Sequence, residues 1–441
     1  MIFSFLKYIQ PTSYFMRYDI NGNSVFPIVS SLSEEIKVLL NEDVNYSSKT
    51  AKNYDLSWQA YKRGFLGQAE FYKTFDELSI QDEYNFIAKY YKKHWLIYIL
   101  VLRLLSFKNP INEIKAFLKS QKINPISLYK VPFHSKIPEN FKSKFHDKQP
   151  LISVVIPTLN RYDYLNRVLR DFEKQTYKNF EIIVVDQSDG FTKEFYNDFS
   201  LKIIVIYQDE KALWLARNTA IKEANGSLIA FSEDDVRIKP DWLSEHLKCL
   251  DYFNADISAG IFFPENESIS KDKDFFTISE QFATGNAMLS KDIFKTVGLF
   301  DRQFEKGRMG DGAFGLRCFL EGYKSVSNPK AYCLDVKAPI GGLREFGAWD
   351  AFRTQNWFVP RPIPSVLYYF RFYFGNKLSK LALIKTIPAS VLPYRLKRNK
   401  ILSVLGAFLA ILIAPILIYQ IIKSWNLATR KLKIGPKIER L

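Results

Sequence analysis

An alternation of apolar strands and helices between residues 151 and 235 constrains the fold more than any other feature. The apolar runs are LISVVIP, EIIVVD, LKIIVIY and SLIAFS, and between them lie YLNRVLRDFEKQT and ALWLARNTAIKEAN. Apolar residues recur with a helical period in both intervening segments. Continuous apolar strands separated by helices are typical of a parallel sheet covered on both faces. The segment is therefore predicted to form an α/β domain with a mostly parallel sheet.

Acidic residues follow two of the predicted strands. Glu233, Asp234 and Asp235 come after SLIAFS, and Asp186 ends EIIVVD. Ligands of open parallel sheets bind outside the carboxyl ends of the strands. Clustered carboxylates suit a hard cation such as Mg²⁺, which takes few carboxylates and completes its shell with water and substrate phosphates. The sequence thus predicts a crevice for a phosphorylated ligand and a divalent cation.

The amino-acid composition limits the kinds of partner and metal site that are expected. The 441 residues carry 62 Lys and Arg against 46 Asp and Glu, a formal net charge of +16 that favours an anionic partner. The basic residues cluster beside apolar segments near the C-terminus and form no nucleic-acid-reading motif, so no nucleic acid is expected. The cysteines are odd in number and lack metal-like spacing, which predicts neither a structural disulfide nor zinc. No signal peptide is recognised at the N-terminus, so the chain is expected in the cytoplasm.

Three parts are predicted along the chain. Residues 1–148 are mostly helical and rich in aromatic residues, with no motif that indicates chemistry. Within them WLIYILVLRLL (95–105) is too short to span a bilayer and contains Arg103, so we expect a buried helix, with an interfacial helix as the alternative. Residues 149–347 hold the α/β domain, and residues 348–441 form a basic, aromatic and apolar helical tail.

The tail contains ILSVLGAFLAILIAPILIYQII (401–422), which is uncharged and long enough to cross a membrane. Basic residues flank it on both sides, so the positive-inside rule does not orient it, and Pro415 allows a re-entrant hairpin. We expect association with an anionic membrane surface as a peripheral, re-entrant or single-span segment. Helices packed on soluble protein are the alternative.

The chain resembles the inverting family 2 glycosyltransferases, which have the Rossmann-like GT-A fold. The resemblance rests on VVIPTLNRYDYLNRVLRDFEKQTYKNFEIIVVDQSDG and on LARNTAIKEANGSLIAFSEDD. Downstream, TGNAMLSKDIFKTVGLFD resembles the family's acceptor-side segment and MGDGAFGLRCFLEGYKSV the block that carries its base. The resemblance implies transfer of a sugar from a nucleotide-sugar donor, with inversion, assisted by Mg²⁺ or Mn²⁺.

Carried over by position, the resemblance makes Asp311 the catalytic base and Asp235 the metal ligand. In AYCLDVKAPIGGLREFG, Asp335 stands where many relatives use a histidine for the metal. The segment GGLR (341–344) could close over phosphates or simply form a turn. Gly310 stands where relatives usually have a glutamate before the base. The implied nucleotide-sugar-binding residues are Pro157, Thr158, Asp186, Arg217, Asn218, Glu233 and Asp234.

These expectations describe a glycosyltransferase at the cytoplasmic face of the cell membrane. The acceptor would be a saccharide or a lipid-linked saccharide, in surface polysaccharide biosynthesis. Two alternatives remain open: a polyprenyl-phosphate glycosyltransferase, and a GT-A membrane scaffold that has lost its activity.

Overall fold

The chain divides into two compact units in a computed structural model that describes residues 1–128, 131–265, 267–339, 350–354, 356–392, 406 and 409–441. One unit contains Met1–His134 and Phe374–Lys385, and the other contains Ser135–Tyr373 and Thr386–Leu441. The domain boundaries predicted from the sequence differ from these. The sequence assigns α13 (Pro364–Ser390) wholly to the C-terminal tail, whereas the middle of this helix belongs to the first unit. The three-part division stays a prediction.

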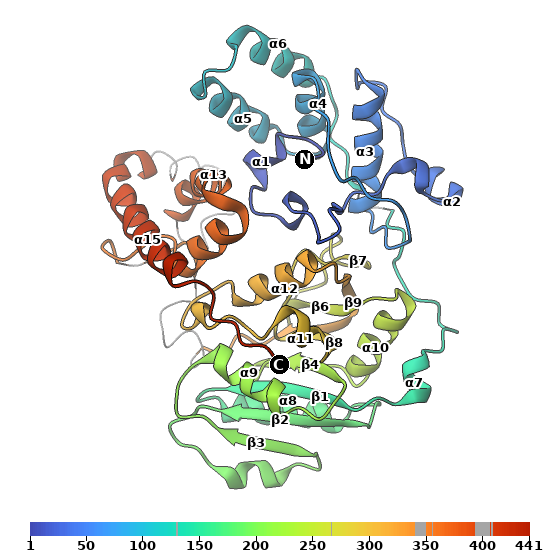
Figure 1. The fold of residues 1–441 in the computed structure, drawn as a ribbon, viewed down its shortest axis with the longest axis vertical. Helices are drawn as coiled ribbons and strands as arrows, with labels where there is room; N and C mark the ends of the chain where they lie inside the picture. The colour runs from blue at the N-terminus through green and yellow to red at the C-terminus, as the bar shows by residue number, and fades with distance from the viewer. Residues whose placement is uncertain (129–130, 266, 340–349, 355, 393–405, 407–408) are drawn as a thin grey trace. The chain divides into compact units, whose positions relative to one another are not determined.

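The first unit is helical, as its composition predicts. Its helices are α1 (Leu6–Ile9), α2 (Glu34–Lys37), α3 (Lys49–Lys62), α4 (Ile80–Tyr90), α5 (Lys93–Leu105) and α6 (Pro110–Ser120) (Figure 1). Ser48 and Ser79 begin α3 and α4 with side-chain caps, since each hydroxyl accepts a backbone N–H of the first turn. Aromatic pairs such as Phe3 and Phe86, whose ring centroids lie 3.8 Å apart, pack its interior.

Helix α5 does not have the burial expected of it. Its buried residues are Leu96, Ile99 and Arg103, on one face, while Ile97 and Val101 on the opposite face are about half exposed (55% and 48%). The prediction of a buried helix is therefore wrong for that outer face.

The described residues of the second unit form a nine-stranded mixed sheet. Its strands are β1 (Ile152–Thr158), β2 (Phe180–Asp186), β3 (Ile203–Tyr207), β4 (Leu228–Ser232), β5 (Val236–Ile238), β6 (Ile257–Pro264), β7 (Thr277–Ile278), β8 (Asn286–Ser290) and β9 (Ser325–Asp335). The order is β3-β2-β1-β4-β8-β6-β9-β5, with β7 on β9. The segment β3-β2-β1-β4 is wholly parallel, as predicted, and β8 inserts antiparallel between β4 and β6. This mixed α/β architecture is consistent with the GT-A fold.

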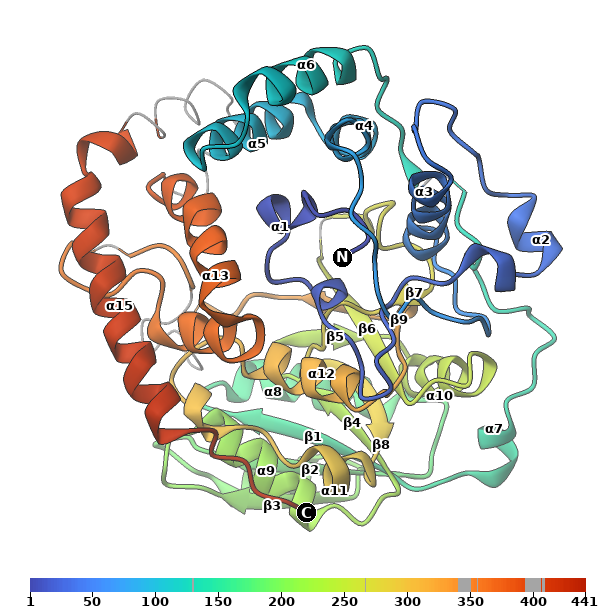
Figure 2. The ribbon, with the colours of Figure 1, turned by 45° about the horizontal axis from the view of Figure 1, so that its top comes forward.

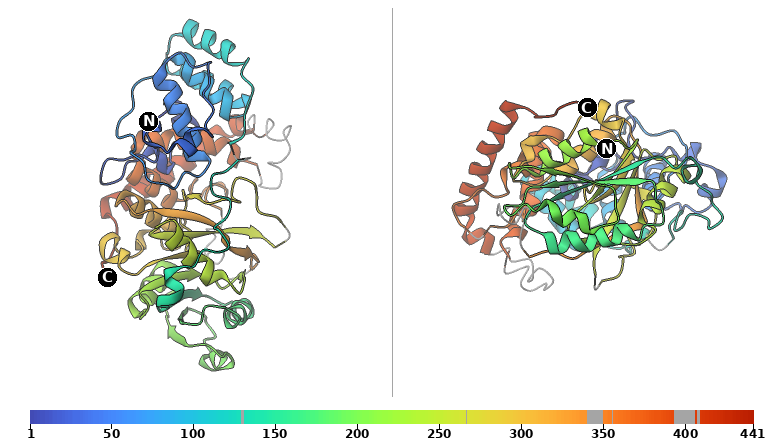
Figure 3. Two further views of the ribbon diagram at one scale, coloured as in Figure 1. Left: turned by 90° about the vertical axis from the view of Figure 1, so that its right-hand side faces the viewer. Right: turned by 90° about the horizontal axis from the view of Figure 1, so that it is seen from below.

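Helices cover both faces of the sheet (Figure 3). Helices α8 (Tyr162–Glu173) and α10 (Trp242–Tyr252) share one apolar core with β1, β2 and β4. On the other face, α9 (Leu213–Glu223), α11 (Ile293–Val297) and α12 (Gly310–Leu320) gather around the rings of Phe231, Phe294, Phe300 and Phe314. Thr158 pairs with Asp186 in register, so β1 and β2 end at the same level.

The end of the chain returns to this unit. After α15 (Ala414–Ile434), the backbone N–H of Leu299 donates to Glu439 O (2.7 Å) and that of Arg302 to Lys437 O (3.1 Å). Among the described residues no helix has the length and apolar character needed to cross a membrane. Most of the basic segment before the predicted span, and residues 401–405, 407 and 408 of the span itself, lie outside the described residues.

Candidate active site

A cavity of about 360 Å³ opens at the carboxyl ends of β1 and β4. It brings together most of the residues predicted from the sequence. They are Pro157 and Thr158 at the end of β1, Arg217 on α9, Glu233, Asp234 and Asp235 after β4, Asp311 in the first turn of α12, and Asp335 at the end of β9. Asp186 and Asn218 do not line it. The segment GGLR (341–344) lies outside the described residues.

Arg161 holds the acidic pair together from the loop after β1. Its Nη1 lies 2.9 Å from Asp234 Oδ1 and 3.2 Å from Asp235 Oδ2. The Thr158 hydroxyl donates to the other oxygen of Asp234 (2.8 Å). Burial alone would lower the pKa of Arg161, but the two carboxylates outweigh it and raise that pKa. One guanidinium therefore supplies the positive charge beside both aspartates.

Glu233 and Asp234 have raised pKa values. Loss of solvent raises the pKa of Glu233 to about 7, although Arg217 Nη2, 3.7 Å away, opposes the shift. Burial likewise raises the pKa of Asp234 to about 6, against the attraction of Arg161. Burial is the main cause of both shifts, and the neighbouring carboxylates add to it. Perturbed acids converging on a cavity are typical of functional sites.

The cavity fits a divalent cation only in part. Among the described residues, no group of three or more Asp, Glu, His or Cys side chains is arranged to hold a metal ion. Asp234 has both oxygens in contact with Thr158 and Arg161, and Asp235 Oδ2 accepts the backbone N–H of Ala338 (3.2 Å). A cation here would take oxygen from Asp235 and from a bound diphosphate, which suits Mg²⁺ and Mn²⁺. Asp335 lines the same cavity, and its Oδ1 accepts the N–H of Lys337 (3.0 Å).

Asp311 faces the cavity from the first turn of α12, and its Oδ1 accepts the backbone N–H of Gly312 (2.8 Å). The glycine before it has a structural reason. A Cβ on Gly310 would lie 2.3 Å from Cζ2 of Trp214, so the indole ring occupies the space that a side chain would need. The residue that precedes α12, Met309, has φ = 79°, a strained conformation at the cavity wall.

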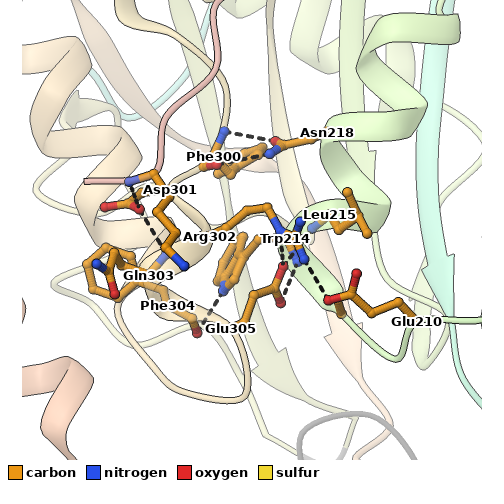
Figure 4. Close-up of polar contacts among 12 residues, drawn as sticks. Glu210, Trp214, Leu215, Asn218, Phe300, Asp301, Arg302, Gln303, Phe304 and Glu305 are labelled. Atoms are coloured by element: carbon orange, nitrogen blue, oxygen red, sulfur yellow. Dashed lines mark hydrogen bonds and ion pairs between the residues drawn. The ribbon is translucent and has the colours of Figure 1, made fainter. Parts of the chain in front are cut away.

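Trp214 and Asn218 fix the segment 300–305 against α9 (Figure 4). The Asn218 amide both donates to Phe300 O and accepts from Phe300 N, each at 2.9 Å. The Glu305 carboxylate accepts the N–H groups of Trp214 (3.2 Å) and Leu215 (2.8 Å) at the start of α9. Asn218 thus holds the segment that leads into the loop after residue 305, and its role in nucleotide binding stays a prediction.

Asp186 is fully buried beside the cavity, where its carboxylate accepts hydrogen bonds from other residues of the chain. Its Oδ2 accepts the hydroxyls of Tyr162 (2.6 Å) and Tyr196 (2.7 Å), and its Oδ1 accepts the N–H of Ser188 (2.9 Å). Burial and the hydrogen bond to Asp186 raise the pKa of Tyr162 to about 12, so the phenol stays a donor. To bind the nucleotide, Asp186 would have to give up a hydrogen bond from one of these tyrosines. Its role in nucleotide binding stays a prediction.

The sequence model of glycosyl transferase family 2 matches residues 153–305. This part of the chain is similar to that family. The match covers β1 to β4, the acidic triplet and the segment that Asn218 holds. The family 2 domain therefore contains the cavity except for the contributions of α12, β9 and the loop before α12.

Curated relatives match the chain over part of their length. Glycosyltransferase GlyA of Streptococcus pneumoniae is 31% identical over 163 residues, which are 36% of this chain and 22% of that protein. The putative teichuronic acid biosynthesis glycosyltransferase TuaG of Bacillus subtilis is 32% identical over 106 residues, 23% of this chain and 42% of that one. The chain thus spans less than half the length of these two relatives.

Solved structures are similar to this chain at lower sequence identity. TarS 1–349 of S. aureus in complex with UDP-GlcNAc is 19% identical, with a TM-score of 0.40 over 56% of this chain and 69% of that one.

Several residues that line the site of the family 2 domain were missed from the sequence. They are Arg161, Gln187, Lys211, Trp214, Thr284, Lys306 and Arg308. Arg161 had a usable signal, since it follows Thr158 by three residues and so lies at a strand's carboxyl end. Lys306 and Arg308 had none, because only the packing of residues 300–305 on α9 brings their loop to the cavity.

Proposed function

We propose that this chain is a glycosyltransferase that moves a sugar from a nucleoside-diphosphate donor to a saccharide acceptor, with inversion. One observation carries the proposal: the cavity joins the acidic triplet after β4 with Asp311 from α12, within reach of a single bound donor. The family 2 match over residues 153–305 supports the same reaction class. The finer fold assignment, GT-A, belongs to this proposal as well.

Basic residues of the cavity suit the donor's diphosphate. Lys211, Lys306 and Arg308 line it from two loops, and Arg217 lines it from α9. Cationic side chains in a site with little water stabilise the charge that develops on a departing diphosphate. Thr158, Pro157 and the acids after β4 would hold the nucleotide and sugar.

Asp311 would act as the general base. Its Oδ1 already accepts the N–H of Gly312, which leaves Oδ2 to take the proton of the acceptor hydroxyl. The deprotonated oxygen attacks the anomeric carbon from the face opposite the diphosphate, so the sugar's configuration inverts. Mg²⁺ or Mn²⁺, held by Asp235 with Asp335 nearby, would supply positive charge at the diphosphate.

The acceptor and location belong to the same proposal. The matched TuaG is named as a putative teichuronic acid biosynthesis glycosyltransferase, and another relative is chondroitin synthase of Escherichia coli. These names favour assembly of a surface polysaccharide on a saccharide or lipid-linked acceptor. We place the reaction at the cytoplasmic face of the cell membrane, with the tail against the lipid. Apolar residues of α15 such as Ile418 and Ile422 are about half exposed (55% and 54%), which supports that placement.

The test is sugar transfer from radiolabelled UDP- and GDP-sugars, with Mn²⁺, to saccharide acceptors. Asp311→Asn should bind donor normally but lose at least about 10²-fold in turnover, because the amide keeps the shape and cannot take a proton. Asp292→Asn is the matched control, since that side chain is 77% exposed and lies outside the cavity. Near-normal turnover of Asp311→Asn would place the base elsewhere.

The same assay separates the alternatives. Product that extracts into organic solvent would indicate a polyprenyl-phosphate acceptor. Failure to bind or hydrolyse any donor would favour a scaffold without activity.

A further inference from the structure

The helical hairpin of α5 and α6 in the first unit buries charged side chains and exposes apolar ones. Its inward face carries Arg103, whose guanidinium donates two hydrogen bonds to the Glu113 carboxylate (2.8 and 2.5 Å). Glu113 Oε2 also accepts the Tyr84 hydroxyl (2.9 Å). Glu113 is fully buried and Arg103 is 8% exposed. The charged groups therefore lie inside, where they join α5 to α6 (Figure 2 shows the two helices side by side).

The outward face of the same hairpin is apolar. Its exposed side chains follow helical spacing on both helices and meet at the connecting loop. They are Ile97 (55% exposed), Val101 (48%) and Leu105 (70%) of α5, Phe107 (98%) of the loop, and Ile111 (74%), Ile114 (43%) and Leu118 (59%) of α6. Phe107 has φ = 54°, so an exposed aromatic ring is held in a conformation that residues other than glycine rarely adopt. Apolar patches of this kind mark interaction sites.

The buried ion pair keeps that face outward. Turning either helix to bury its apolar side chains would expose one partner and leave Arg103 or Glu113 without the other. Breaking a buried pair in this way is strongly destabilising. The Arg103 guanidinium also lies 4.5 Å from the ring of Phe5, which fixes it from a further element. The outward apolar face is thus a property of the fold.

The lysines around the outward apolar face indicate which kind of partner covers it. Between residues 92 and 122 there are six exposed lysines and one acid, Glu113, which is buried and paired; the lysines are Lys92, Lys93, Lys108, Lys115, Lys119 and Lys122. An apolar face bordered by lysines is the pattern of a helix that lies in the interface of an anionic membrane. A second copy of the chain would bring the same six positive charges against these, which opposes self-association.

We propose that the outward face of the α5–α6 hairpin docks on an anionic lipid bilayer, with Phe107 and its apolar neighbours inserted at headgroup depth. Neither helix could span the bilayer, since α5 has 13 residues and α6 has 11, against about 20 for a crossing. Lys108 and Lys115 contact the headgroups. The docking needs neither donor nor acceptor, so it stands or falls independently of the proposed reaction.

The test is sedimentation of the full chain with phosphatidylcholine vesicles, with or without phosphatidylglycerol. Leu105→Ser/Phe107→Ser/Ile111→Ser should weaken binding to the anionic vesicles about tenfold or more. The matched control Ile20→Ser/Val38→Ser/Val44→Ser changes side chains of similar exposure (69%, 81% and 86%) elsewhere in the same unit and should bind as wild type. Lys108→Glu/Lys115→Glu should weaken binding more than Lys49→Glu/Lys73→Glu.

A local probe separates this face from the tail. The three native cysteines are buried, so a Ser106→Cys variant takes a polarity-sensitive fluorophore beside Phe107, and Val44→Cys serves as its control. Anionic vesicles should shift the emission to the blue at position 106 and leave it unchanged at 44. The proposal is overturned if wild type ignores anionic vesicles, if the serine triple variant binds like wild type, or if position 106 stays wet on the vesicle. It is equally overturned if the serine triple variant only dissociates an oligomer.

Discussion

The glycine before the proposed base offers the sharpest test of the site's packing. Gly310→Ala adds one carbon that would lie 2.3 Å from Cζ2 and 2.4 Å from Cε2 of Trp214. Carbon atoms pack at about 3.5–4.0 Å, so the approach is more than about 1 Å too close. The indole cannot easily retreat, because it is 3% exposed and its Nε1–H donates to Phe304 O (3.1 Å). Overpacking of this kind costs roughly 1–3 kcal/mol, and we expect the upper half of that range.

Gly312→Ala is the matched control in the same helical turn. Its added carbon would meet only Tyr369, at 3.9 Å, which is an ordinary contact. Replacing glycine by alanine in an unstrained helix stabilises by about 0.4–1 kcal/mol, because the unfolded chain loses freedom. Two chemically identical substitutions two residues apart should therefore change the free energy of unfolding in opposite directions.

Urea unfolding followed by circular dichroism measures both changes. Trp214→Leu is then introduced into wild type and into Gly310→Ala. With the ring removed, the cost of Gly310→Ala should fall by at least about 1 kcal/mol, which is a coupling energy between contacting residues. Equal stabilities of the two alanine variants, or an unchanged cost beside Leu at 214, would refute the reasoning.

Three further predictions address metal, pH and the chain end. Asp335→Ala should raise the Mn²⁺ concentration needed for half-maximal activity, and a wild-type titration would remove Asp335 from the site. Burial lowers the pKa of His246 to about 3, so below pH 6.5 the unfolded chain binds a proton that the folded chain excludes. Unfolding free energy should then fall by about 1.4 kcal/mol per pH unit from 6.5 towards 3, a slope that His246→Gln should lack in urea titrations. Deleting residues 436–441 removes the hydrogen bonds of Leu299, Asp301 and Arg302 to the chain end and should lower unfolding free energy by about 2–4 kcal/mol; an unchanged urea midpoint would contradict this.

The parallel half of the sheet was predictable because its signal is local. Each of β1, β2 and β4 is a run of apolar residues between helices of clear period, and the acids after β4 stand at a strand end that any parallel sheet exposes. The other half was not, since β8 pairs antiparallel with β4 although some fifty residues separate them. No periodicity in a sequence records which distant strand will become a neighbour.

The sequence by itself predicted the parallel α/β segment and the acidic triplet at its strand ends, because residue type and spacing along one segment carry that information, and the family resemblance singled out Asp311 as the base. Only the tertiary structure decided that Arg161 lies between Asp234 and Asp235, that Asp186 is satisfied by two tyrosines, and that Trp214 takes the space beside Gly310. It alone decided that α5 turns Arg103 inward and its apolar side chains outward. The physical reason is common to all four. Tertiary packing decides which group lies within a few ångströms of a side chain, and so which group neutralises its charge or fills the space beside it. That group lies in another part of the chain or on another element.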